Sequence, residues 1–292
     1  MRALALLLLF ASGVHAATIT INGATLDGVK FRLPATDWSG CASLVAYWKL
    51  DETGTNDRVP YSGSCPTSDC TLTNINGVTN VTGIRGQAVA SNGGSKYVKC
   101  DDTDCDELDF TSDFTIVNTF QPGSLFGNWR SVSKGAFGTR GYFLRHDIFL
   151  TANNPDFAVG TTSIGTPVST LSAGEWNFAA AYFDDTNDDI NQYISSETTG
   201  WSKGTDGTLT SLSGTTDQFR VAQASTTLTQ GYVDELSAWG IVLTEAEACR
   251  ICSCYVDGEG CVRDGTGYID TGWNDTICGS CTLPDSNAAC PA

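Results

Sequence analysis

Few side chains in this sequence are arranged for catalysis. Residues 200–204 read Gly-Trp-Ser-Lys-Gly and satisfy the Gly-x-Ser-x-Gly spacing of a nucleophile elbow, a strand-to-helix turn that exposes a reactive serine. The next residues, Thr-Asp-Gly-Thr at 205–208, favour a turn-rich hairpin instead of the helix that an elbow requires. His15 lies in the leader described below, which leaves His146 alone and excludes a multi-histidine zinc site.

The N-terminus has the pattern of a secretory signal. A basic start, Met1-Arg2, precedes an apolar run from Ala3 to Ala11 and small residues up to Ala16. We expect cleavage after Ala16, which makes the mature chain a secreted, extracellular protein. The apolar run is too short to span a bilayer, and the sequence contains no later stretch of about 18 apolar residues, so no membrane insertion is expected.

The twelve cysteines of an exported chain predict a disulfide framework. They fall into an N-terminal and a C-terminal group, which are Cys41, Cys65, Cys70, Cys100 and Cys105, and Cys249, Cys252, Cys254, Cys261, Cys278, Cys281 and Cys290. Both groups are odd in number, so at least one bridge joins them if every cysteine is paired. We expect Cys41 to pair with Cys249 or Cys252.

Two other pairs are spaced to staple single loops, Cys65 with Cys70 and Cys100 with Cys105. The Cys-x-x-Cys spacings of the C-terminal group would suggest a zinc ribbon in a cytosolic protein. Export favours disulfides there instead. The connectivity of the remaining C-terminal cysteines stays open.

The chain is strongly acidic, with a formal net charge of −17. This charge repels phosphate backbones and anionic lipid surfaces, which argues against nucleic acid as a partner. An acidic surface is compatible with bound cations, but its simplest role is to keep an extracellular protein soluble.

Short β-branched and aromatic runs, separated by turn-forming clusters, fill the chain from Leu44 onward. In residues 113–120, the side chains of Phe114, Ile116 and Phe120 share one face. Further strands are expected at residues 44–50, 97–99, 142–145, 176–183, 190–194, 218–222 and 232–239. Thr244, with a glutamate three residues later, has the capping-box spacing that begins a helix.

These segments predict an all-β fold, an antiparallel two-sheet β-sandwich, with a small disulfide-rich tail. The tail has no apolar periodicity and depends on its disulfides. The expected division of the chain is a signal peptide at 1–16, an N-terminal arm at 17–40, the sandwich at 41–252 and a cysteine-rich tail module at 253–292.

Several segments together resemble the laminin-G-like, or concanavalin A-like, jellyroll family. The matching segments are 44–52 (LVAYWKLDE), the Gly-x-x-Gly-x-Ala turn at 83–88, a following hairpin at 92–98, the strand at 108–116, the Ser-Lys-Gly turn at 133–135, and the closing strand and turn at 231–247 (GYVDEL and LTEAE). The resemblance spans about residues 42 to 252. It implies a sandwich common in lectins and adhesion modules, and fold alone does not fix function.

The resemblance also implies a calcium site, with Asp57, Asn92 and Asp234 as its ligands, because calcium prefers loop carboxylates and carbonyls. The alternative is that Asp234 only hydrogen-bonds a neighbouring loop. The acidic run at 101–109 lacks EF-hand spacing and is expected to be solvated.

Glycosidases of the same general fold carry Glu-x-Asp-x-(x)-Glu on a strand. Glu107 and Asp109 begin this pattern, but Thr111 and Ser112 stand where the last glutamate should be. Asp234 and Glu235 are neighbours on a predicted strand, so their side chains should point to opposite faces, whereas a retaining enzyme needs two carboxyl groups on one side. The sequence therefore predicts a protein that is not an enzyme.

Sugars are commonly bound by aromatic faces together with amides and carboxylates. Trp129 and Trp201 lie in glycine-flanked, loop-rich contexts and are the candidate ligand-binding residues, while the other strand tryptophans are expected in the core. Asn80 and Asn274 begin glycosylation sequons.

Three functions remain. The first is a lectin-like carbohydrate-binding or adhesion module whose partner is an extracellular glycan or glycoprotein, with calcium as candidate cofactor. The second is a structural surface, matrix or coat subunit. The third is a glycoside hydrolase, which the missing carboxylate disfavours.

Overall fold

The computed structural model describes 15 segments of the chain. These are residues 17–21, 24–29, 43–61, 63–84, 86–92, 96–123, 129–136, 140–147, 154–160, 162–165, 171–196, 201–209, 212, 214–224 and 230–256. The predictions for the signal peptide, Cys41, Asn274 and the tail beyond residue 256 lie outside these segments.

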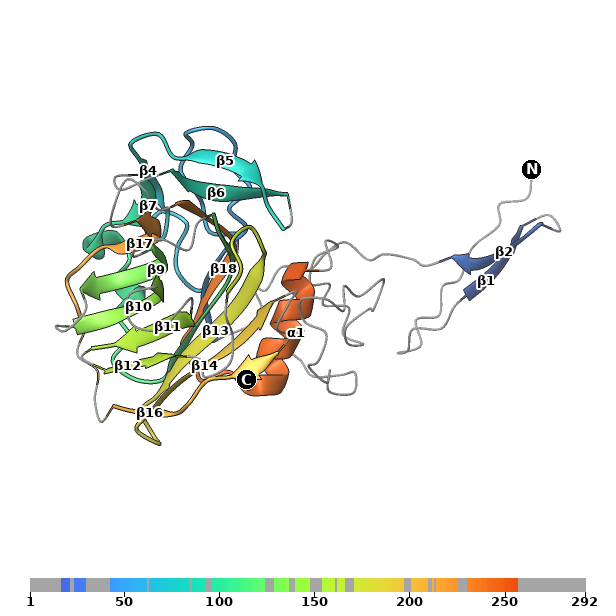
Figure 1. Cartoon of the computed structure of the whole chain (residues 1–292). Helices are drawn as coiled ribbons and strands as arrows, with labels where there is room; N and C mark the ends of the chain where they lie inside the picture. Colours follow the sequence, from blue (N-terminus) through green and yellow to red (C-terminus); the bar gives the residue numbers. More distant parts are fainter. Residues whose placement is uncertain are drawn as a thin grey trace.

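Two antiparallel sheets form the body of the protein (Figure 1). The nine-stranded sheet contains β15 (Ser202–Lys203), β14 (Asp189–Ser196), β13 (Asn177–Asp184), β8 (Phe114–Pro122), β18 (Gln230–Trp239), β6 (Gln87–Asn92) and β5 (Thr79–Thr82) in spatial order, with β16 (Gly207–Thr208) on β14 and β3 (Leu44–Trp48) on β18. Its central strands are long and almost continuously buried.

The seven-stranded sheet faces it. Its order is β12 (Thr162–Gly165), β11 (Asn154–Val159), β10 (Arg140–Asp147), β9 (Trp129–Ala136), β17 (Phe219–Ala224), β7 (Tyr97–Cys100) and β4 (Thr73–Ile75). Two short 3-10 turns, η2 (Asp102–Asp104) and η3 (Asp106–Leu108), follow β7. In the predicted N-terminal arm, β1 (Ala17–Ile21) and β2 (Ala24–Val29) pair as a separate two-stranded sheet.

The main hydrophobic core fills the space between the two sheets. The predicted inward set, Phe114, Ile116 and Phe120, is confirmed, because all three belong to this core. From the opposite sheet, Phe219 stacks on Trp48 with a ring-centroid distance of 5.7 Å. Side chains at alternate strand positions thus point into one shared core, as a sandwich requires.

A second hydrophobic cluster lies on the outer face of the nine-stranded sheet, under the helix α1 (Glu245–Val256) (Figure 1). Phe178 and Tyr182 of β13 face outward into this cluster, and Tyr255 of α1 stacks on Tyr47 at 5.7 Å. The predicted capping box is confirmed, because Thr244 Oγ1 accepts the Glu247 N–H and Glu247 Oε2 accepts the Thr244 N–H.

Two sequence expectations about turns were wrong. Ser133, Lys134 and Gly135 lie within β9 and not in a turn. Residues 92–98 do not form a hairpin, because β6 pairs in the nine-stranded sheet and β7 in the seven-stranded one. The chain passes between the sheets here, which a local motif cannot show.

Two disulfides that the spacing predicts are confirmed, Cys65–Cys70 and Cys100–Cys105. Cys249 and Cys252 of α1 are also disulfide-bonded. The pairing of Cys41 with either of them stays a prediction, since Cys41 lies outside the described residues.

The sequence predicted that the acidic run at 101–109 is solvated, but two of its carboxylates contact a buried lysine. Lys134 is fully buried, and its ammonium lies 3.2 Å from Asp102 and 2.9 Å from Asp109. It also donates to the Cys105 carbonyl at 3.3 Å. A lysine from the core therefore neutralises two of these carboxylates.

Candidate functional site

The outward-directed side chains of the seven-stranded sheet form two cross-strand rows, most of whose members are polar. In the first row, Lys99, Arg220, Ser133, Phe143 and Ala158 are successive partners across β7, β17, β9, β10 and β11. These residues alternate with core residues such as Phe219, Val221, Tyr142 and Leu144. Strand periodicity alone therefore directs this row away from the core.

The second row contains Gln223, Arg130, Arg145 and Asp156 on β17, β9, β10 and β11. The register of β9 and β10 shifts between Leu144 and Arg145, so that Ser131 has no partner on β10. This irregularity places Arg130 directly opposite Arg145. Directly opposed residues have Cβ atoms about 5 Å apart, where like charges destabilise a sheet.

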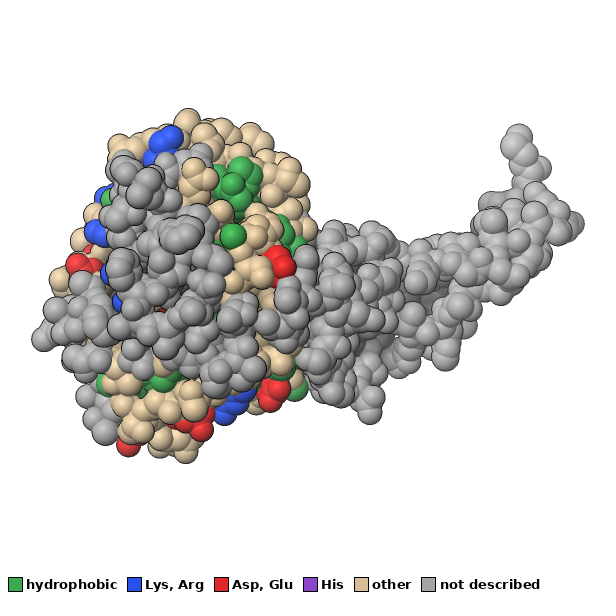
Figure 2. All heavy atoms as spheres, in the orientation of Figure 1, with side chains coloured by type: hydrophobic (Ala, Val, Ile, Leu, Met, Phe, Trp, Pro, Cys, Tyr) green, Lys and Arg blue, Asp and Glu red, His purple; other side chains and the backbone are tan. Residues whose placement is uncertain are grey.

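We call this set the arginine face: Arg130, Arg145, Arg220, Ser133, Phe143 and Gln223. Arg130, Arg220 and Gln223 are partly exposed, whereas Ser133, Phe143 and Arg145 are buried. Figure 2 shows blue, basic side chains near the left margin of the body, the side on which Figure 1 places the seven-stranded sheet. Neither hydrophobic cluster includes Phe143. Two guanidinium groups lie near its ring, with Arg130 Cζ 4.9 Å and Arg145 Cζ 5.4 Å from the ring centroid.

The three arginines differ in how they are neutralised. Arg145 is buried and donates to Asp156 Oδ2 through Nε, at 3.1 Å, and through Nη2. Arg220 instead donates to the amide oxygen of Gln218 at 3.2 and 3.3 Å and lies over the Tyr97 ring. Within the described segments, no carboxylate forms an ion pair with Arg130 or Arg220.

The electrostatics of Arg130 reflect this crowding. Burial lowers the pKa of its guanidinium, and repulsion from Arg145 and then Arg220 lowers it further. Mutual repulsion in a partly buried cluster is unfavourable in the isolated protein, and perturbed groups of this kind concentrate at functional sites.

Next to the arginine face, beside β7, Asp101 forms hydrogen bonds with two neighbouring side chains. Asp101 accepts from Lys99 Nζ and from Gln218 Nε2, each at 2.6 Å. The Lys99 hydrogen bond is the main reason that the pKa of Asp101 is lowered. Gln218 thus connects Asp101 to Arg220 and fixes the orientation of that guanidinium.

The structure corrects the expectation for Trp129. It is only 2 % exposed, and its ring packs in the core beside Phe120 and against Gly231, where a Cβ would lie 2.3 Å from the indole. A ring in this place cannot present a face to a sugar.

Trp201 lies on the other sheet and is half-buried. Its ring stacks on Phe178 and Tyr193, with both centroid distances 5.8 Å, and Nε1 donates to Glu245 Oε1 of α1 at 2.9 Å. The structure therefore does not bring the two predicted tryptophans together. A role of Trp201 in ligand binding stays a prediction.

The predicted calcium ligands have other partners. Asp57 Oδ1 accepts the Asn74 N–H at 3.0 Å, whereas Asp234 is fully buried and accepts the Glu235 N–H at 2.9 Å. Asp234 also lies against Gly83, where a Cβ would be 2.3 Å from Oδ2, in agreement with the alternative of a loop contact. The side chain of Asn92 lies outside the described atoms, although its backbone pairs with Gln230.

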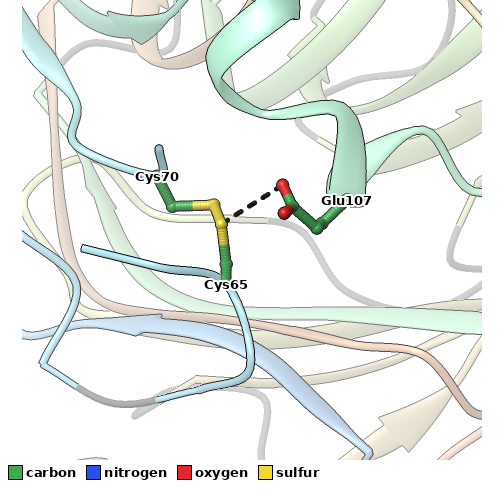
Figure 3. A group of neighbouring side chains, drawn as sticks. All are labelled: Cys65, Cys70 and Glu107. Atoms are coloured by element: carbon green, nitrogen blue, oxygen red, sulfur yellow. Dashed lines mark hydrogen bonds between the residues drawn. A yellow bond between two sulfur atoms is a disulfide. The ribbon is translucent and has the colours of Figure 1, made fainter. Parts of the chain in front are cut away.

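Carboxylate and amide oxygens are chemically suited to calcium. Among the described residues, however, neither Asp57 nor Asp234 belongs to a group of three potential metal ligands. Calcium binding stays a prediction, and no step below depends on it. The one group of three potential ligands found in the described segments is Cys65, Cys70 and Glu107 (Figure 3). Its two sulfurs are bonded to each other, so it offers no thiolate for a metal.

The candidate catalytic carboxylates are placed unfavourably. Glu107 lies in η3 and not on a strand, 3.4 Å from Cys65 Sγ. Asp234 and Glu235 do not point to opposite faces, as the sequence suggested. A bulge with φ of 48° at Glu235 leaves Val233 and Leu236 both in the core, so the two acids lie together on the other side.

Both acids are inaccessible. Asp234 is 0 % and Glu235 1 % exposed, and Tyr47 donates its hydroxyl to Glu235. Ser202 of the Gly-x-Ser-x-Gly spacing lies on the short strand β15 and no helix follows it within 203–209, which agrees with the expected turn-rich context.

The Asn80 sequon has a buried acceptor. Its Nδ2 is buried and has no hydrogen-bond partner, while Oδ1 accepts from Arg58 at 3.0 Å. Glycosylation of Asn80 stays a prediction.

A laminin G family model, described as the concanavalin A-like lectin/glucanases superfamily, matches residues 92–249. No curated protein matches the sequence. No helix in the described part of the chain is long and apolar enough to cross a membrane.

Solved structures share the fold at low sequence identity. Domain 4 of AbnA, an extracellular arabinanase from Geobacillus stearothermophilus in complex with arabinotriose, is 16 % identical with a TM-score of 0.55, over 72 % of this chain and 98 % of that one. The binding domain of botulinum neurotoxin DC in complex with rat synaptotagmin II is 9 % identical with a TM-score of 0.52, over 70 % of this chain and 50 % of that one. The same toxin domain in complex with SialylT has a TM-score of 0.50 at 9 % identity, over 69 % and 48 %.

Proposed function

Because the chain belongs to the concanavalin A-like lectin/glucanases superfamily, we propose that it is a secreted, non-catalytic carbohydrate-binding module. The observation that carries the proposal is a group of partly exposed polar side chains, Arg130, Arg220 and Gln223, on the outer face of the seven-stranded sheet. Sugar hydroxyls need hydrogen-bond donors and acceptors fixed on a rigid support, and a sheet face supplies them.

Three further observations support this assignment. The related arabinanase domain was solved with a bound sugar, arabinotriose. The acids that could form a glycosidase pair, Asp234 and Glu235, are buried away from any substrate. Disulfides such as Cys65–Cys70 are typical of secreted proteins and support an extracellular location.

A glycan-array screen of the oxidised mature chain tests the proposal, with calcium and again with a chelator. We expect selective glycan binding that Gln223→Ala weakens, because Gln223 lies on the arginine face. The matched control is Gln121→Ala on β8 of the other sheet. Loss of binding with the chelator would add calcium to the proposal.

Two results would contradict the proposal. Wild-type chain that binds no glycan in either condition would favour the structural, matrix or coat subunit. Release of reducing sugar from a bound glycan would show an enzyme instead of a binding module.

A further inference from the structure

The arginine face gathers positive charge on a chain that is acidic as a whole. The protein has a net charge of −17, yet Arg130, Arg145 and Arg220 gather on one face of one sheet. A surface selected only for solubility would intersperse the two signs of charge. The cluster instead concentrates positive charge on an acidic protein.

Internal pairs cancel only part of this charge. Asp156 neutralises Arg145, and Asp101 neutralises Lys99 at 2.6 Å. Arg130 and Arg220 have no acidic partner within the described residues, and both are only half-buried. Two positive charges therefore remain for a ligand to neutralise.

The two guanidinium groups are also held in place before any ligand arrives. Arg130 is stacked over Phe143, and Arg220 over Tyr97, with Cζ 4.9 and 5.5 Å from the respective ring centroids. A guanidinium that lies over an aromatic ring can still donate its N–H groups in its own plane. Arg220 donates Nε and Nη2 to Gln218, so its remaining N–H groups are the ones left for a ligand. Such groups match the two or three oxygens of a carboxylate or sulfate.

We propose that the arginine face selects sugars that carry a negative charge, and that Arg130 and Arg220 bind the carboxylate or sulfate group. This inference rests on the proposed carbohydrate-binding function and adds the class of ligand. Asp156 already offsets the charge of Arg145, and a bound anion would offset the repulsion that remains between Arg130 and Arg220. Gln223, opposite Arg130, lies where it can contact the neighbouring sugar hydroxyls.

Affinity electrophoresis and calorimetry with four defined polymers test this proposal. Arabinan is the neutral sugar, polygalacturonate carries carboxylates, dextran sulfate carries sulfates, and polyglutamate is an anion without sugar. We expect wild-type chain to bind one or both acidic polysaccharides at least about tenfold more tightly than arabinan or polyglutamate. Whichever of the two is preferred identifies the anion.

Variants locate the contact. Arg130→Gln and Arg220→Gln should each weaken acidic-sugar binding by about tenfold, since hydrogen bonds to charged groups are strong. Arg130→Lys should restore part of the affinity, because it keeps the charge but loses the planar fork. Lys203→Gln, on β15 of the other sheet, removes the same charge elsewhere and should leave binding unchanged. Thermal unfolding of each variant establishes that it is folded.

The outcomes separate this inference from the proposed function. Equal affinity for arabinan and the acidic sugars, unaffected by Arg130→Gln, would overturn the inference and leave the carbohydrate-binding function standing. Polyglutamate that binds as tightly as the acidic sugars would overturn selection of a sugar. Wild-type chain that binds none of the three polysaccharides would contradict both.

Discussion

The two outer faces of this sandwich have opposite chemistry. On the nine-stranded sheet, Phe178 and Tyr182 belong to an apolar cluster that also contains Ile251 and Tyr255 of α1. On the seven-stranded sheet, Arg220 and Arg145 take the equivalent outward positions, and no described hydrophobic cluster lies over them. Both sheets supply the same inner core, so the outward residues give the two faces their different chemistry: apolar packing on one, and partly exposed Arg130 and Arg220 on the other.

The largest expected effect is a loss of stability in the hydrophobic cluster between α1 and the nine-stranded sheet. Tyr255→Ala should lower the free energy of unfolding by about 3–5 kcal/mol, because it removes a buried aromatic ring from the contact between α1 and the sheet. Urea unfolding measures this loss. Tyr255→Phe keeps the ring and removes the 2.6 Å hydrogen bond to Ser237, so it should cost about 1 kcal/mol.

Glycan affinity completes this test. At temperatures where Tyr255→Ala remains folded, we expect its affinity to equal that of the wild type, since the helix lies away from the arginine face. A loss of affinity in folded Tyr255→Ala would show that the two faces do not have separate roles.

An intermediate effect is expected at the neutralised arginine. Asp156→Asn removes the negative partner of buried Arg145 and should lower the free energy of unfolding by about 1–3 kcal/mol. It also adds one net positive charge to the arginine face, so affinity for an acidic polysaccharide should rise. Calorimetry and urea unfolding measure the two effects together.

Asp185→Asn is the charge-matched control, because Asp185 is exposed and lies between β13 and β14 of the other sheet. Should Asp156→Asn bind acidic sugar no better than this control, the charge of the face would not contribute to recognition.

Most of the fold could be predicted from the sequence, because period-two alternation and local turn chemistry are local signals. Phe114, Ile116 and Phe120 identified a core-facing strand, and Thr244 identified the start of α1. Such signals fail where the chain changes sheet, as between β6 and β7, since residues on either side of the crossing have similar patterns.

The arginine face could be predicted only in part. Arg220 alternates with Phe219 and Val221, which identifies it as outward-facing. The placement of Arg130 beside Arg145 depends on the register shift opposite Ser131, and a register shift leaves no mark in hydrophobic periodicity. Trp129 was misassigned for a related reason, because its glycine-flanked context resembles a loop while Gly231, far along the chain, provides the space for its ring.

The smallest expected effect concerns like charges on the other sheet. Burial, and then the charge of Asp206, raise the pKa of Asp189 at the start of β14, although Lys203 lies 3.3 Å from Asp206. A raised folded-state pKa means that ionisation of Asp189 opposes folding. Its cost is present above the folded pKa and disappears as the pH falls toward the unfolded value of 3.8.

Asp189→Asn should therefore gain stability relative to wild type as the pH rises from about 3.5 to 7. Urea unfolding at the two pH values measures this difference, with the exposed Asp185→Asn as control. An unchanged difference would show that acidic crowding at β14 is without energetic consequence. The expected change would show that burial and the nearby charge of Asp206 together oppose ionisation of Asp189. The arginine face would then differ in the sign of its crowded charges, because Arg130 and Arg220 there would favour an anion.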